Sequence, residues 1–231
     1  LTRKEKQVSN FMKMLLSVAQ DLRVIIIKFA DRLHNMKTID HMPQIKKHRI
    51  AIETRDIYIP LAHRMGMSAV KSQLEDLVFK VLKSEHFYDI KAKVKSSKKQ
   101  RLKFVNEVIE PIKLELNKYE ILPNIYGRAK SYASIYNKMI ARNKSFEEIY
   151  DLHALRIIVA RPEQCYLALG LVHNLYLPVQ DRFKDFIATP KTNGYQSIHT
   201  TIIGPKGKMV EIQIRTDSME ETAEIGVAAH W

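Results

Sequence analysis

The hydrophobic pattern of the chain changes near residue 120, and this change limits the folds that the chain can adopt. Before that point, apolar residues recur at the three- and four-residue spacing of amphipathic helices, and no segment has the alternation of a strand. We expect Pro60 and Gly66 to break the helical run, and Pro111 to be a source of a kink. The pattern predicts helices over residues 7–20, 22–36, 44–59, 69–83 and 98–118.

After residue 120, strand signals alternate with helical ones. "LHALRIIVA" (152–160) is a β-rich run, and "SIHTTII" (197–203) and "KMVEIQIR" (208–215) flank "GPKG", which predicts a hairpin. Helices are expected over 131–142, 162–175 and 217–229. The chain is therefore predicted to be α+β, with a helical part that ends near "NKYEILPNIYG" (117–127).

The net charge of +13 favours polyanionic partners such as nucleotides or nucleic acid, although a solvated basic surface would give the same balance. The basic run at 91–103 is expected to be a solvated loop and helix start, with a polyanion contact as the alternative. No P-loop or dinucleotide-binding glycine motif occurs. No apolar run reaches the roughly 18 residues of a membrane span. The single cysteine, Cys165, excludes an internal disulfide and suits a reducing cytosol.

Two carboxylates are candidates for chemistry in the second half. Alternation along 208–215 puts Glu211 on the face opposite Val210 and Ile212, although a solvated sheet face would look the same. Asp151 precedes the β-rich run, where a turn or capping aspartate is equally common. Carboxylates on neighbouring strands can hold Mg²⁺ together with phosphate oxygens.

Cations and an aromatic ring accompany these carboxylates. Arg128 and Lys130 precede the helix expected at 131–142, and a helix N-terminus beside cations attracts anions. Ser131 and Ser134 can cap that helix or donate to a phosphate. Tyr195 follows an Asn-Gly turn, where its ring can stack on a base or pack within the loop. The residues alone predict transfer of a phosphate group and leave open which one.

Several long motifs resemble those of the RelA/SpoT homologue family, whose members make and degrade the alarmone (p)ppGpp. They are "GRAKSYASIYNKM", "YDLHALRIIV", "RFKDFIATPKTNGYQSIHTTIIGPKGKMVEIQIRT" and "AEIGVAAHW", in the family's order. "VIIIKFADRLHNMKT" and "IYIPLAHRMGMSAVKSQLEDLVFK" are similar to the second part of the family's hydrolase domain. Ala129 stands where the family often has proline.

The resemblance implies a synthetase with a nucleotidyltransferase-like mixed sheet that moves pyrophosphate from ATP to the 3′-hydroxyl of GDP or GTP. It assigns Asp151 and Glu211 to Mg²⁺ and catalysis, with Glu211 as the base. The residues implied for ATP phosphates are Arg128, Lys130, Ser134, Arg182 and Lys184. Those implied for GDP or GTP are Lys191, Asn193, Tyr195 and His199. The basic stretch Arg182–Asp185 is acidic in synthetase-only members, which favours the bifunctional branch.

The hydrolase half is expected to be incomplete. The resemblance makes Asp31 a ligand of an HD-type Mn²⁺ site, with Asn35 and Thr38 lining the nucleotide pocket. No histidine precedes His34, and no His-Asp dipeptide occurs, so the remaining ligands are missing. We therefore expect this chain not to hydrolyse (p)ppGpp, although the intact protein should. The expected domains are 1–90 (truncated hydrolase), 91–120 (basic linker and connecting helix) and 121–231 (synthetase).

Two rival interpretations stay open: a regulatory or RNA-binding module with a non-catalytic helical lid, and an unrelated nucleotidyltransferase. On the main interpretation, the partners are ATP and GDP or GTP in the cytoplasm, without a membrane. Contacts with ribosome or tRNA are expected only through regions outside this chain. The sequence leaves the oligomeric state open.

Overall fold

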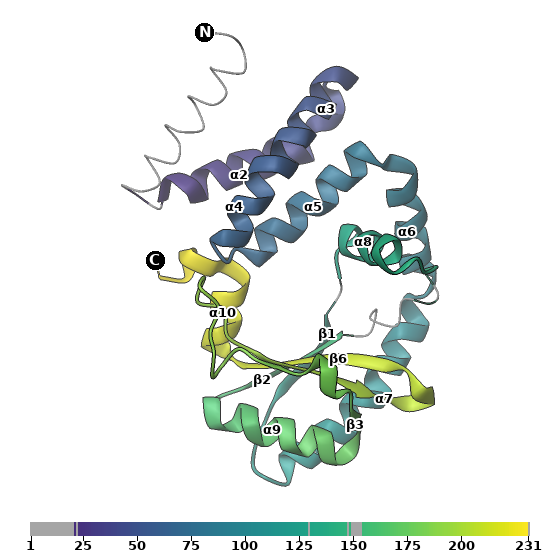
Figure 1. Ribbon diagram of the computed structural model, residues 1–231, viewed down its shortest axis with the longest axis vertical. Helices are drawn as coiled ribbons and strands as arrows, with labels where there is room; N and C mark the ends of the chain where they lie inside the picture. Colours follow the sequence, from purple (N-terminus) through teal and green to yellow (C-terminus); the bar gives the residue numbers. More distant parts are fainter. Residues whose placement is uncertain (1–20, 22, 129, 147, 149–153, 231) are drawn as a thin grey trace.

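The computed structural model describes residues 21, 23–128, 130–146, 148 and 154–230. Its first part is helical, with α2 (Arg23–Lys37), α3 (Gln44–Glu53), α4 (Ile59–Arg64), α5 (Ser68–Leu82) and α6 (Ser84–Ser96). Helices α2 to α5 pack on one another through a shared core that includes Ile25, Phe29 and Leu74. Figure 1 shows α2 to α5 gathered at one end of the molecule and the sheet toward the other.

The second part is built on a mixed sheet in the order β1-β2-β6-β5-β3, with β4 also paired to β5. Strands β2 and β6 are parallel, and the other pairs are antiparallel. The strands are β1 (Asn124–Arg128), β2 (Ala154–Val159), β3 (Leu177–Pro178), β4 (Lys184–Asp185), β5 (Ile198–Ile203) and β6 (Met209–Thr216). The accompanying helices are α7 (Lys98–Asn117), α8 (Tyr132–Arg142), α9 (Pro162–Leu175) and α10 (Asp217–Ile225). The predicted α+β class is confirmed.

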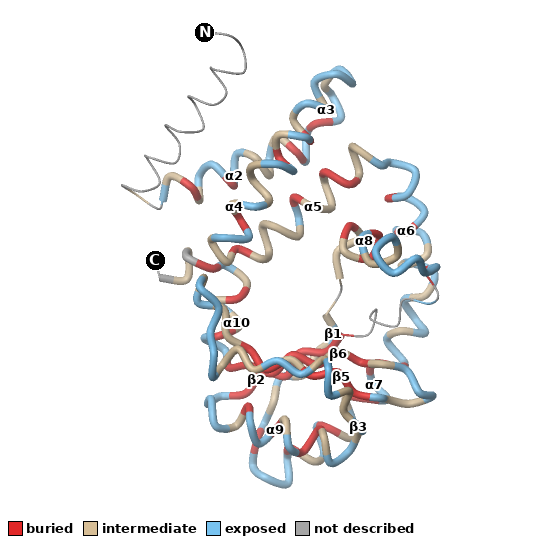
Figure 2. Tube along the Cα trace, in the orientation of Figure 1, coloured by how far each residue is buried: buried red, intermediate tan, exposed pale blue. Residues whose placement is uncertain are grey.

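One face of the sheet is covered by α7 and α9. Val108 and Ile112 of α7 and Val172 of α9 share a core with Ile212 and other buried strand residues. Figure 2 shows this buried layer along the strands. Every residue of β2 is buried, and all of them are apolar except Arg156, so this strand lacks the alternation of a half-exposed strand. The opposite sheet face is left to carry the polar side chains.

Helix α8 packs against the helical part rather than against the covered face of the sheet. Its Ala133, Ile135 and Tyr136 are buried together with Phe79 of α5 and Phe87 of α6. Figure 1 shows α8 beside α6, with the sheet below. The two parts of the chain are thus joined by a core that includes residues from both.

Several local expectations need correction. The helix does not break at Pro60: a π-helical turn (Thr54–Tyr58) leads directly into α4, and Pro60 lies in the first turn of α4. Gly66, with φ of +72°, follows the end of α4 as predicted. The basic run at 91–103 is not a loop: α6 continues to Ser96 and α7 begins at Lys98. Helix α10 ends at Ile225, and a 3₁₀ turn (Gly226–His230) follows.

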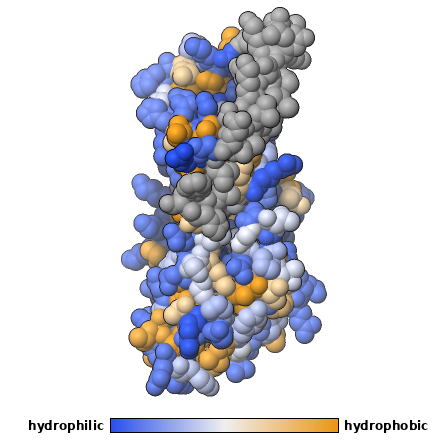
Figure 3. Space-filling view, turned by 90° about the vertical axis from the view of Figure 1, so that its left-hand side faces the viewer, coloured by the Kyte–Doolittle hydropathy of each residue, from blue (hydrophilic) through white to orange (hydrophobic). Residues whose placement is uncertain are grey.

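Figure 3 shows mostly hydrophilic described side chains on one side of the molecule, with small apolar groups among them. Among the described helices, none combines the length and the apolar character that a membrane span requires.

Candidate active site

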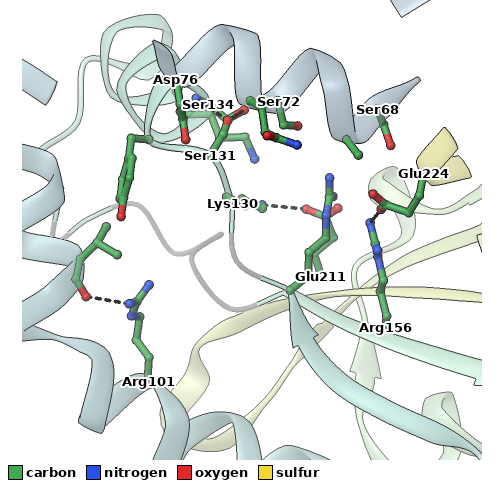
Figure 4. Close-up of a pocket in the computed structure, with 16 residues that line it drawn as sticks. Ser68, Ser72, Asp76, Arg101, Lys130, Ser131, Ser134, Arg156, Glu211 and Glu224 are labelled. Carbon is green, nitrogen blue, oxygen red and sulfur yellow. Dashed lines mark hydrogen bonds and ion pairs between the residues drawn. The ribbon is translucent and has the colours of Figure 1, made fainter. Parts of the chain in front are cut away.

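Glu211 lies on the uncovered face of the sheet, in the middle of its central strand. It pairs in register with Ala154 of β2 and Thr201 of β5. Val210 and Ile212 on either side point into the core that α7 and α9 cover. The predicted alternation along this strand is therefore confirmed, and it directs Glu211 toward α5 and α8 (Figure 4).

An ion pair fixes the carboxylate of Glu211. Lys130 Nζ lies 2.9 Å from Glu211 Oε2, and Gln213 Nε2 donates to Oε1 at 3.1 Å. Burial lowers the pKa of Lys130 to about 8 despite the attraction of Glu211, and the charge of Lys138 contributes to this lowering. Burial alone would raise the pKa of Glu211, but Lys130 outweighs it, so the pKa is lowered and the carboxylate stays ionised.

Two cavities meet at Glu211. The larger, about 630 Å³, lies between the sheet, α5 and α8 (Figure 4). Its charged and hydroxyl-bearing lining consists of Ser68, Ser72, Asp76, Arg101, Arg128, Lys130, Ser131, Tyr132, Ser134, Lys138, Arg156, Glu211 and Glu224. The smaller, about 270 Å³, is lined by Lys138, Arg142, Asp181, Arg182, Lys184, His199, Thr200, Thr201 and Glu211. Lys138 and Glu211 line both, so one cation and one carboxylate stand at the junction.

The residues expected to bind ATP phosphates are divided between these cavities. Arg128, Lys130 and Ser134 line the larger one, whereas Arg182 and Lys184 line the smaller one. The division follows from the fold, because β4 pairs with β5 and Lys184 stands in register with His199, away from β1. A polyphosphate that reached both groups would have to pass Glu211.

The residues expected to bind GDP or GTP are only partly brought together. His199 lines the smaller cavity, whereas Lys191, Asn193 and Tyr195 line neither of the two. Tyr195 Oη lies 2.6 Å from His199 Nε2, and Arg215 Nη2 donates to Tyr195 Oη at 3.2 Å. Lys191 Nζ lies 5.0 Å from the centroid of the Tyr195 ring. Burial lowers the pKa of His199 to about 4, so this imidazole is neutral at pH 7.

Asn193 links its turn to the helical part. Its Oδ1 accepts from the Tyr195 amide at 3.3 Å, and its Nδ2 donates to the His63 carbonyl oxygen at 3.3 Å. The Asn-Gly turn expected from the sequence is present, with φ of +76° at Gly194. Each polar atom of the Asn193 side chain has one partner, and each keeps the capacity for a second hydrogen bond, which a nucleotide could use.

The predicted hydrolase residues line neither of the two cavities. Asp31 and Asn35 belong to α2, Asp31 is exposed, and Thr38 donates from Oγ1 to the His34 carbonyl oxygen. Asp151 lies outside the described residues. In the described part of the chain, no three or more His, Cys, Asp or Glu side chains gather in a way that could hold a metal ion.

Several residues that line these cavities are not predicted from the sequence, among them Lys138, Arg142, Arg156 and Asp76. Lys138 and Arg142 follow Ser134 at four-residue intervals, a helical spacing that would have placed all three on one face of α8. Arg156 in the buried strand β2 makes ion pairs with Glu220 and Glu224 of α10. Asp76 comes from α5, and no local pattern links it to the sheet. Ser131, which the sequence offered as a cap, does cap α8: its Oγ accepts a hydrogen bond from the Ser134 amide.

The helical part and the sheet-bearing part of the chain match different family models. Residues 127–231 match the family model described as a region found in RelA / SpoT proteins, and residues 1–68 match an HD domain model. A GTP pyrophosphokinase of Myxococcus xanthus is 49% identical over 231 residues, which are 100% of this chain and 30% of the relative. The bifunctional (p)ppGpp synthase/hydrolase SpoT of Escherichia coli K12 is 46% identical over 229 residues, 99% of this chain and 33% of the relative.

Among solved structures, the small alarmone synthetase 1 from Bacillus subtilis bound to its product pppGpp is 28% identical, with a TM-score of 0.44. That match covers 52% of this chain and 70% of the synthetase. The present chain spans about a third of the length of the curated relatives that it matches.

Proposed function

This chain belongs to the RelA/SpoT family, and on that premise we propose that its sheet-bearing part transfers pyrophosphate from ATP to the 3′-hydroxyl of GDP or GTP. The observation that carries the proposal is the ionised Glu211 at the junction of two cation-lined cavities. A carboxylate among cations suits a reaction between two polyanions, in which one hydroxyl proton must be accepted.

In the proposed reaction, the 3′-oxygen of the acceptor forms a bond to the β-phosphorus of ATP. The bond from that phosphorus to the bridging oxygen of the α-phosphate breaks, and AMP leaves with the electron pair. Glu211 accepts the hydroxyl proton. Lys130, which lies 2.9 Å from Glu211, directs its charge to the phosphates in this reaction, which leaves the carboxylate free to act as base.

We propose that the two groups of cations serve successive parts of the polyphosphate. Arg128, Lys130 and Ser134 in the larger cavity bind ATP phosphates, with Lys138 at the junction. Arg182 and Lys184 in the smaller cavity balance charge on the transferred group. The acceptor guanosine lies against Tyr195, with Lys191, Asn193 and neutral His199 around its ribose and phosphates.

Mg²⁺ is proposed as the cofactor of synthesis. The donor chemistry fits, because Glu211 offers hard carboxylate oxygens beside a phosphate site, and Asp151 would supply a second carboxylate. When bound, Mg²⁺ would neutralise phosphate charge. In the hydrolase half, Asp31 is the proposed Mn²⁺ ligand, and Asn35 and Thr38 the proposed nucleotide contacts. Hydrolysis by this chain is not expected, since the other ligands of the family pattern do not occur in it.

The proposed domains remain 1–90, 91–120 and 121–231, with one refinement. Helix α7 packs into the core of the sheet, so it belongs with the synthetase part rather than with a linker. We place the whole protein in the cytoplasm, with any contact to ribosome or tRNA made by regions outside this chain.

The proposed function is tested by incubating the chain with ATP, GDP or GTP, and Mg²⁺, and separating the nucleotides by chromatography. Equal amounts of AMP and of ppGpp or pppGpp are expected. Transfer of an adenylyl group to RNA would support the unrelated nucleotidyltransferase instead. RNA binding without any nucleotide product would support the regulatory module.

A further inference from the structure

Asp76 of α5 reaches from the helical part of the chain to the first turn of α8. Its Oδ1 accepts a hydrogen bond from the Ala133 amide at 2.9 Å, and the Tyr132 amide also stabilises the charged carboxylate. Figure 4 shows Asp76 beside Ser131 and Ser134, at the edge of the larger cavity. Burial raises the pKa of Asp76, and the two amides offset part of that rise.

These contacts provide hydrogen-bond acceptors for the first backbone amides of α8. The first amides of a helix have no partner within the helix. Here Ser131 Oγ accepts from the Ser134 amide, and Asp76 serves Ala133 and Tyr132. The expected anion site at this helix N-terminus is therefore occupied by a carboxylate of the protein itself. Phosphates in the larger cavity must be bound by side chains instead.

One face of α8 packs against the helical part, and another face lines the two cavities. Tyr136 packs on Phe79 of α5, with ring centroids 4.9 Å apart, and Ala133 is buried in the same core. Ser134 and Lys138 line the larger cavity, and Lys138 and Arg142 line the smaller one. A rotation or shift of α8 relative to α5 would therefore move all three polar side chains relative to Glu211.

We propose that Asp76 is a positioning residue for the synthetase site: by bonding the first amides of α8 to α5, it holds Ser134 and Lys138 against the donor phosphates. The proposal rests on the proposed function, because it takes the larger cavity as the ATP-phosphate site. It makes the helical part a structural component of the synthetase site, since one wall of that site is fixed by a carboxylate from α5. Charge repulsion alone predicts the opposite effect of removing Asp76: a cavity with one carboxylate fewer would bind ATP phosphates more tightly.

The test is the affinity of the chain for a non-hydrolysable ATP analogue with Mg²⁺, measured by calorimetry. Asp76→Ala should weaken binding about tenfold, since it leaves two amides without an acceptor. Asp76→Asn keeps one acceptor oxygen and should stay within about threefold of the unaltered chain. The affinity for GDP should not change in either variant. Glu75→Ala is the matched control, because this neighbouring carboxylate on α5 pairs with Lys71 instead, and it should bind both nucleotides normally.

Unchanged or tighter binding of the ATP analogue by Asp76→Ala would overturn the proposal, as would an equal loss for ATP analogue and GDP. Amide hydrogen exchange gives a second readout. Faster exchange at Tyr132 and Ala133 in Asp76→Ala is expected, and unchanged exchange at both would contradict the capping contact. The binding measurement needs no turnover, so it is independent of the activity assay. A chain that binds the analogue but makes no ppGpp would refute the proposed function. The ratio of analogue affinities between Asp76→Ala and the unaltered chain would still test the role of Asp76.

Discussion

Lys130 and Glu211 form an ion pair across the candidate site, with Nζ 2.9 Å from Oε2, although 81 residues separate them in sequence. Lys130 belongs to the segment that leads into α8, and Glu211 to the central strand of the sheet. Only 8% of the Lys130 side chain is exposed, so its charge is held in place by the carboxylate rather than by water. The pair thus connects the wall that carries the proposed phosphate-binding side chains with the proposed catalytic base.

The first prediction concerns pH. Burial lowers the pKa of Lys130 to about 8, so this side chain loses its charge as pH rises through 8. Since kcat/KM reports the free enzyme, kcat/KM for ATP should fall up to about tenfold between pH 8 and 9. Lys130→Arg stays charged throughout, and its profile should lack this fall. A decline at the same pH in both proteins would assign it to another group.

The second prediction concerns Tyr195. Tyr195→Ala should raise the KM for GDP by about tenfold or more, because a stacked base contributes roughly 1–3 kcal/mol, and should change the KM for ATP little. Tyr195→Phe keeps the ring but removes the hydroxyl that contacts His199 and Arg215. This variant should retain most of the affinity for GDP. Equal effects of Tyr195→Ala on both substrates would count against stacking.

The third prediction concerns the contact between the helical part and the end of the sheet part. A Cβ on Gly226 would lie 2.2 Å from the Met65 carbonyl oxygen and 2.5 Å from the Gly66 carbonyl carbon, and φ at Gly226 is +58°. Gly226→Ala should therefore lower the free energy of unfolding by about 1–3 kcal/mol, seen as a lower Tm.

The matched control is Gly170→Ala in α9. An added Cβ there meets nothing within 4 Å, and alanine favours a helix over glycine by about 0.5–1 kcal/mol. This variant should melt at the same temperature as the unaltered chain or slightly higher. If Gly226→Ala melted no lower than Gly170→Ala, the close approach of these two segments would be refuted.

Local patterns predicted the strands β2, β5 and β6 but not β1 or the two-residue strands β3 and β4. The alternation along 208–215 identified the hairpin and the face that carries Glu211, because a strand with one buried face has a period of two. Ser131 before an amphipathic run indicated the cap of α8. In each case the residues that determine the structure lie within a few positions of one another, so the local sequence is enough to predict it.

Contacts between distant segments could not be predicted in this way. Asp76 lies 57 residues before Ala133, and Asn193 lies 130 residues after His63, so neither bond has a local signal. The break predicted at Pro60 is absent for a different reason: a π-helical turn leads directly into α4, and a rule based on the proline alone does not foresee it. The division of Arg182 and Lys184 from Arg128 depends on strand order, which no spacing encodes.

The central claim is that Glu211 accepts the proton of the attacking hydroxyl, and the most direct measurement is the rate of ppGpp formation by Glu211→Gln. Glutamine keeps the size and the contact with Lys130 but cannot take a proton. We predict a fall in kcat of about 10²- to 10⁴-fold. Glu107→Gln, at an exposed carboxylate on α7, is the control and should be fully active. A Glu211→Gln chain that makes ppGpp at more than about a tenth of the normal rate would contradict the account.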